Sequence, residues 1–207
     1  MQTSAKTHTQ ARAPRLPAEE RRKQILDAAV EVFAHMGYGT AGTADIARAA
    51  GIGEPTIYRY FSNKRDLYVA AVRRSSDEIL EAWGTIAGDA PDALTALQRI
   101  GVWYYQRLQS RPELLLLRSR SISDSQDGSV AEVVREQYLA IMHFVEALFR
   151  RAQAEGQVDA DEDVGTLTWL FMAVGTLLDQ AQILGLDELT PAHVLRITAL
   201  IQPRKRE

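Results

Sequence analysis

The sequence has no cysteine, few prolines and no long uninterrupted apolar run. Without cysteine, disulfides, thiolate catalysis and cysteine-ligated metals are excluded. No run approaches the ~18 consecutive apolar residues that a membrane helix needs, and the N-terminus lacks the apolar core of a signal peptide. Few segments alternate in polarity as strands do. We therefore expect an all-α protein in the cytoplasm, with no membrane partner.

Signatures of enzyme chemistry are also missing. No Gly-x-Ser-x-Gly elbow occurs, and Gly51-x-Gly53 lacks the third glycine and the preceding strand of a dinucleotide fingerprint. The acidic residues of 159–163 lack calcium-loop spacing and its central glycine. The histidines do not cluster at metal-binding spacing; they are His8, His35, His143 and His193. We expect no catalytic residues, no metal and no cofactor.

Charge is unevenly distributed along the 207 residues. Through Arg74 there are 12 Lys and Arg against 7 Asp and Glu, a net charge of +5, and the rest carries 12 against 20, a net charge of −8. A basic first third on an acidic remainder suits DNA binding at one end of the molecule. An accidental asymmetry is the alternative.

Residues 42–64 read GTADIARAAGIGEPTIYRYFSNK and predict a helix-turn-helix. Two short helical patterns flank Gly51-Ile52-Gly53, whose glycines permit backbone angles that cost other residues energy. Such paired helices are joined by a short turn that often contains glycine. A third helix is expected at 19–36, ended by Gly37. The alternative is a small helical hairpin with a solvated charged face.

The outward face of the second motif helix carries hydroxyl and cationic side chains. Side chains of this kind contact phosphates and position a protein on DNA. Arg59 could also read a guanine edge with two hydrogen bonds. This face holds Glu54, Thr56, Tyr58, Arg59 and Tyr60, with Lys64 just beyond.

Residues 19–74 resemble the DNA-binding domain of the tetracycline-repressor (TetR) family. The matching positions form one long ordered series, which is more specific than a short motif. They are Ile25, Ala28, Ala29, Phe33, Gly37, Tyr38, Asp45, Ile46, Ala47, Ala49, Ala50, Gly51, Ile52, Thr56, Ile57, Tyr58, Arg59, Tyr60, Phe61, Lys64 and Leu67. The resemblance implies a homodimeric transcriptional regulator, usually a repressor, that a small ligand releases from DNA.

The resemblance also implies a set of DNA-contacting positions. They are Thr43, Gly53, Glu54, Pro55, Thr56, Tyr58, Arg59, Tyr60 and Lys64. Two departures from the family stand out. Ala41-Gly42 replaces a hydroxyl pair, so a weaker helix cap is expected at Gly42. Glu54 puts a carboxylate among phosphates; it could accept from a cytosine amino group, or simply favour the helix start.

The chain divides into three expected parts. Residues 1–17 are polar and aperiodic and predict a disordered arm, inert or touching DNA. Residues 18–64 form the helix-turn-helix domain, and 65–207 form a helical-bundle domain for ligand binding and dimerisation. Helices are expected at 64–83, 91–109, 112–122, 129–155, 161–184 and 190–201.

The helix at 161–184 has one side of mostly small residues and is apolar over much of the remainder. The small side holds Gly165, Thr168, Met172, Gly175, Thr176 and Asp179. The resemblance implies that the last two long helices, at about 161–184 and 190–201, pair with those of a second subunit, and a small-residue side fits such close packing. A seam inside one subunit is the alternative.

The resemblance further implies that a ligand lies among the helices of the larger domain. Ligand pockets are largely apolar with a few polar groups, so a small, largely apolar effector is expected. The candidates are Trp103, Tyr104, Phe144, Trp169, Met172, Asp179 and Gln182. Ordinary core packing is the alternative for each aromatic, and Asp179 could instead cap a partner helix.

These observations predict a homodimeric, ligand-responsive regulator bound to a palindromic double-stranded operator. A DNA-binding protein without small-molecule regulation is the first alternative. An enzyme using the helical cavity is the second.

Overall fold

The computed structural model describes residues 16–126, 128–186 and 190–200, and the regular elements in these ranges are all α-helices. The expected all-α class is therefore confirmed. The predicted arm lies almost entirely outside the described residues. The helices are α1 (Ala18–Thr40), α2 (Thr43–Ala49), α3 (Glu54–Ile57), α4 (Lys64–Gly88), α5 (Ala93–Ser110), α6 (Glu113–Asp124), α7 (Gly128–Ala154), α8 (Val164–Leu184) and α9 (Pro191–Leu200).

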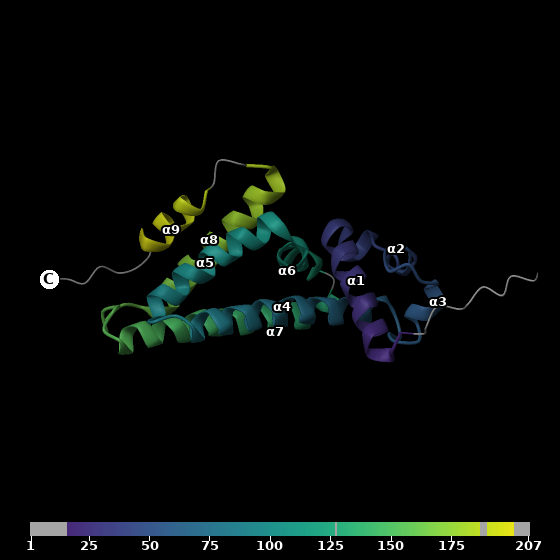
Figure 1. Cartoon of the computed structure of the whole chain (residues 1–207), viewed down its shortest axis with the longest axis horizontal. Coiled ribbons are helices and arrows are strands. Elements are labelled where there is room, and N and C mark those ends of the chain that lie inside the picture. The colour runs from purple at the N-terminus through teal and green to yellow at the C-terminus, as the bar shows by residue number, and fades with distance from the viewer. Residues whose placement is uncertain (1–15, 127, 187–189, 201–207) are drawn as a thin grey trace, which may run out of the picture.

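The first three helices form one end of an elongated molecule (Figure 1). The main body of α1 reaches Gly37, which has φ 75° and interrupts the helix before one further turn. Gly51 also has positive φ, at 64°, as the turn between the motif helices requires. Gly53 does not, because it caps α3 with φ −77°; the expectation of an unusual backbone angle there was wrong.

An apolar core holds the three short elements against the start of α4. The predicted motif strips are buried: Ile46 is 0% exposed and Ile57 1%. Phe33 of α1 and Tyr68 of α4 meet edge to face, with ring centroids 4.9 Å apart. Because α2 and α3 are too short to be stable alone, this packing fixes their orientation.

A second core fills the larger part of the molecule. Helices α4 and α7 run side by side along its length, with α5 and α8 crossing above them and α9 outermost (Figure 1). Helix α4 belongs to both cores: Leu67 and Val72 lie in the first, Ile79 and Trp83 in the second. Helix α4 therefore packs against both the first three helices and the larger domain.

Helix α8 corrects the interpretation of its small side as a dimer surface. Thr168, Met172 and Asp179 are buried within the subunit, and a Cβ on Gly175 would lie 4.0 Å from Tyr104 Cζ. The small side thus packs against α5, as the alternative had it, because the bulky Tyr104 ring needs space.

Another side of α8 carries large apolar residues that are exposed. Trp169 is 61% exposed and Leu177 50%. By length and composition, α8 is the described helix that could cross a membrane, with 39% of its apolar window buried.

Candidate nucleic-acid interface and internal cavity

The second motif helix is shorter than the expected 54–60. Regular α-helix covers Glu54–Ile57, and the chain continues in tighter turns, with Arg59 N donating to Thr56 O (3.2 Å) and Tyr60 N to Ile57 O (2.9 Å). Such i to i+3 bonding is common at helix ends. In these tighter turns the side chains of Tyr58 and Arg59 are exposed and that of Tyr60 is half-buried. The Phe61 side chain lies in the core.

The residues expected to contact DNA differ in exposure. Gly53, Pro55, Tyr58 and Arg59 are exposed, whereas Thr43 is buried. The others are half-buried: Glu54, Thr56, Tyr60 and Lys64. Helix α3, next to the exposed group, lies at one end of the molecule (Figure 1).

Thr43, Glu54 and Tyr58 form a hydrogen-bonded group at this end of the molecule. Thr43 Oγ1 donates to Glu54 Oε1 at 2.5 Å and lies 2.9 Å from Tyr58 Oη. The Glu54 carboxylate is thus used to join α2 to α3. This hydrogen bond gives Glu54 a structural role within the protein. It also leaves less of the carboxylate available to repel a DNA phosphate.

Helix α2 begins without a hydroxyl side chain at its N-cap position. Gly42 occupies the N-cap position, and Asp45 Oδ2 accepts its N–H at 3.0 Å. This bond satisfies one backbone donor from within the helix.

Two cations lie over aromatic rings near the same end. Lys64 Nζ is 4.7 Å from the Tyr38 ring centroid, and the Arg22 guanidinium is 5.1 Å from that of Phe61. A cation over a ring face is attracted to it. This contact positions the half-buried Lys64 beside the motif.

The larger domain encloses a small apolar cavity of about 30 Å³. It lies where α4, α5, α6, α7 and α8 meet. The lining residues are Trp83, Ile100, Gly101, Tyr104, Arg118, Ile141, Phe171, Met172, Val174, Gly175 and Leu178.

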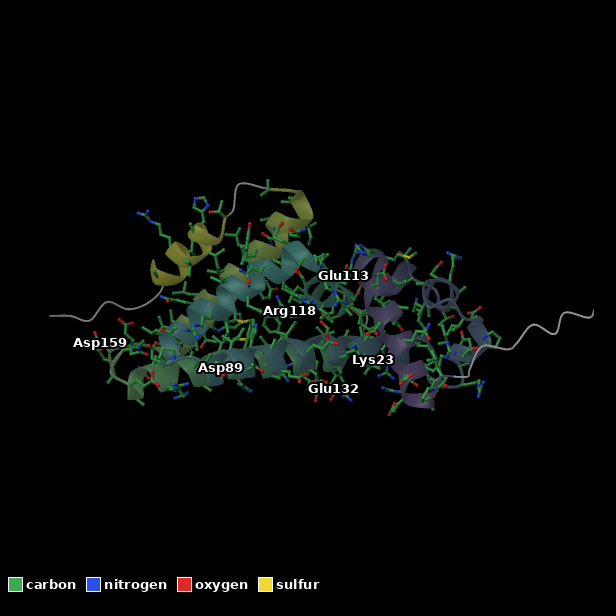
Figure 2. All side chains as sticks on the ribbon, viewed as in Figure 1. Lys23, Asp89, Glu113, Arg118, Glu132 and Asp159 are labelled. Carbon is green, nitrogen blue, oxygen red and sulfur yellow. The ribbon has the colours of Figure 1, made fainter. Side chains whose placement is uncertain are left out.

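A buried ion pair closes one wall of this cavity. Arg118 Nη2 donates to Asp179 Oδ2 at 3.0 Å and to Tyr104 Oη at 2.6 Å, and Tyr104 Oη donates to Asp179 Oδ1 at 2.7 Å. Figure 2 places Arg118 in the interior of the molecule. Burial raises the pKa of Asp179, against the opposing effects of Arg118 and Tyr104. Burial also raises the pKa of the Tyr104 hydroxyl, which keeps it a donor.

The residues expected to bind a ligand are only partly brought together. Tyr104 and Met172 line the cavity and Asp179 lies behind its wall, while the Phe144 ring centroid is 5.9 Å from that of Trp83. The other three lie away from it: Trp103 is half-buried elsewhere, Trp169 is exposed, and Gln182 accepts from Gln109 near the surface.

Sequence reasoning missed Trp83 and Arg118. Trp83 was taken as the end of a connecting helix, although that helix continues to Gly88. Arg118 follows the apolar run 114–117, and an arginine after such a run gives no signal of its own burial.

Helix α6 joins the cavity wall to the DNA-binding end. Arg120 Nη1 donates to the carbonyl oxygens of Ala34 (2.8 Å) and His35 (2.6 Å) in α1. Asp124 Oδ2 accepts from Tyr68 Oη at 2.8 Å and from Tyr38 N at 3.2 Å. Helix α6 therefore carries both Arg118 of the cavity wall and the two residues, Arg120 and Asp124, that bond to α1.

The first third of the chain matches a known protein family. Residues 25–71 match the family described as bacterial regulatory proteins, tetR family. The chain is similar to the HTH-type transcriptional activator FasR of Mycolicibacterium smegmatis, with 46% identity over 69 residues, which cover 33% of this chain and 32% of that protein.

Longer matches extend into the larger domain. The HTH-type transcriptional repressor KstR of Rhodococcus jostii is 28% identical over 144 residues, covering 70% of this chain and 65% of that one. The chain thus spans between about a third and just under two thirds of these two relatives. The transcriptional regulator FadR from Bacillus subtilis, solved in complex with stearoyl-CoA, has a similar fold, with TM-score 0.77 and 19% identity over 87% of this chain and 97% of that one.

Proposed function

We propose that the chain, which carries the DNA-binding domain of the tetR family of bacterial regulatory proteins, is a ligand-responsive transcriptional repressor. The observation that carries the proposal is a helix-turn-helix joined by hydrogen-bonded α6 to an internal cavity. Relatives include an activator and a repressor. Repression is the mode we propose, with the ligand releasing the protein from DNA.

The DNA-binding surface is proposed to act in pairs on a palindromic operator. Each subunit would place α3 and the turn to Tyr60 in a major groove, with half-sites about one helical turn, ~34–36 Å, apart or slightly more. Arg59 is exposed on that surface and carries the planar donor pair that guanine edges accept. The domain at 18–64 would therefore read the operator, and the remainder would pair the subunits and bind the effector.

The exposed apolar side of α8 is proposed as the surface that pairs two subunits. Leu170, Leu177 and Leu184 recur every seven residues and are all at least 45% exposed. A seven-residue apolar repeat is typical of one helix packing along another. Leu195 on α9 is also exposed. A homodimer through α8 and α9 buries this surface, and a palindromic site requires such a pair.

The cavity is proposed to hold the effector, a small and largely apolar molecule. At about 30 Å³ it is far below the ~300–1,000 Å³ of typical ligand pockets. A ligand must therefore push the surrounding helices apart. Two of them, α4 and α6, reach the DNA-binding end, so opening the cavity changes the spacing of the two reading surfaces. The B. subtilis regulator with a similar fold was solved in complex with stearoyl-CoA. This complex supports an effector that is largely apolar.

Replacing Arg59 and Lys64 separately should distinguish base reading from phosphate contact. We expect Arg59→Ala to cost about 1–3 kcal/mol on the operator and much less on random DNA, because a base contact is lost. Lys64→Ala should weaken both DNAs alike and lower the salt slope by about one. Fluorescence anisotropy with both DNAs over a salt series measures this.

Arg150 supplies the matched control. It is an exposed arginine on α7, paired with Glu146, and Arg150→Ala should leave both affinities unchanged. Equal losses for Arg59→Ala on operator and random DNA would contradict the assignment.

Removing the Asp124 carboxylate should uncouple the effector from DNA. In Asp124→Ala, α6 loses its bonds to Tyr68 and Tyr38, so we expect unchanged effector affinity but a several-fold smaller effect of effector on operator affinity. Glu132→Ala, which removes an exposed carboxylate on α7, is the control. Calorimetry for the effector and anisotropy for DNA, each with and without the other ligand, measure the coupling. Wild-type coupling in Asp124→Ala would rule out the Asp124 hydrogen bonds as the connection.

A further inference from the structure

Two residues that line the internal cavity each carry a buried hydrogen-bond donor without an acceptor. Trp83 Nε1 and Arg118 Nε are buried with no hydrogen-bond partner among the described residues, and both side chains line the cavity. Leaving a buried N–H unmatched is energetically costly, and such groups are uncommon in native proteins. Two of them on one cavity indicate a place where an acceptor atom binds.

The charge of the wall limits which acceptor fits. The Arg118 guanidinium already has the Asp179 carboxylate 3.0 Å away, so the wall is close to neutral. A ligand carboxylate would compete with Asp179 for the same cation, and two carboxylates in a site of low dielectric repel each other. An uncharged oxygen accepts the same N–H bonds without that repulsion.

The remaining lining is apolar and comes from three different helices. Ile100 lies on α5, Ile141 on α7, and Phe171, Met172 and Leu178 on α8. Space for about one or two water-sized groups fits the oxygen end of a larger molecule. The rest of such a molecule must be apolar, because it would lie against these side chains.

We propose that the cavity binds the uncharged carbonyl group of an apolar molecule, an ester, thioester, amide or ketone, through Trp83 Nε1–H and Arg118 Nε–H. This rests on the proposed function only in taking that molecule as the effector; the binding site stands on the two donors. Trp83 belongs to α4 and Arg118 to α6, so a carbonyl oxygen bound by both donors would contact both helices that lead to the helix-turn-helix.

Binding of matched probes to the full chain without DNA tests this proposal. The probes are methyl esters from acetate to palmitate, the corresponding carboxylates and the corresponding alkanes, titrated by calorimetry. We expect at least one ester to bind, and to bind about tenfold or more tightly than its carboxylate. Trp83→Phe, which keeps an aromatic ring but removes the N–H, should weaken that ester about tenfold, the equivalent of one hydrogen bond, and leave the alkane unchanged.

Trp103→Phe is the matched control, because Trp103 lies outside the cavity lining, and it should leave ester affinity unchanged. In wild-type protein, the indole N–H resonance that disappears in Trp83→Phe should shift downfield on ester addition, which keeps the test valid if the variant folds poorly. Three outcomes overturn the proposal: no ester binds, a carboxylate binds more tightly than its ester, or Trp83→Phe weakens ester and alkane equally. Since no DNA is present, failure here is distinct from failure to recognise an operator.

Discussion

Replacing Asp179 with alanine should lower the free energy of unfolding by about 3–5 kcal/mol. The variant leaves the Arg118 charge buried without its partner and removes the acceptor of the Tyr104 hydroxyl. Domains are stable by only about 5–15 kcal/mol, so the loss is a large fraction of the total. Urea unfolding at one fixed protein concentration measures it, since subunit pairing makes stability depend on concentration.

A double variant separates the lost pair from the lost carboxylate. Apolar residues of similar size often replace a buried ion pair at little cost, so Arg118→Met with Asp179→Leu should be more stable than Asp179→Ala. Asp179→Asn, which keeps an oxygen acceptor for Tyr104, should fall between wild type and alanine. A cost below 1 kcal/mol for Asp179→Ala would show that the pair is not an essential part of the cavity wall.

Replacing Leu177 with glutamate should convert a dimer to a monomer and weaken operator binding about 100-fold or more. Leu177 is 50% exposed in the subunit and lies in the middle of the apolar repeat on α8, where pairing would bury two opposed carboxylates at heavy cost. A monomer also loses the ~10²–10⁴-fold gain that linked binding to two half-sites supplies. Sedimentation velocity and anisotropy on the same sample measure both effects.

Ile122 supplies the control for Leu177. It is a large apolar residue of α6 with 45% exposure, outside the α8 repeat, so Ile122→Glu should leave the subunit paired. Dimeric Leu177→Glu protein with intact operator affinity would show that another surface joins the subunits.

The helix-turn-helix could be predicted from the sequence because each feature that specifies it acts between residues close together in the chain. Glycine at positive φ at 51, apolar strips at steps of three and four, and proline in the first turn of α3 each act within a few residues. The hydrogen bond between Thr43 and Glu54 could not be predicted. It depends on the angle between α2 and α3, which is set only in the folded protein. For Glu54 the sequence therefore predicted a cytosine contact or a favourable helix start, and not this hydrogen bond.

The cavity was harder to predict because its chemistry depends on distant residues. Arg118 and Asp179 are 61 positions apart, and neither one predicts the other. The orientation of α8 was misinterpreted for a related reason: the helix has two apolar sides, and composition does not say which side meets Tyr104. Asp179 was predicted as a ligand contact or a cap for a partner helix, and its side chain is 1% exposed within the subunit.

Protection of the DNA upstream of its own gene by the full chain tests the central proposal most directly. Footprinting should reveal a palindrome-like protected site with half-sites about one helical turn apart, bound by the dimer with a steep salt dependence from ~6–10 phosphate contacts. A ligand that binds the cavity should remove the protection. Equal affinity for the upstream DNA and for random DNA, with no protected site, would contradict a sequence-specific regulator and favour a general DNA-binding protein.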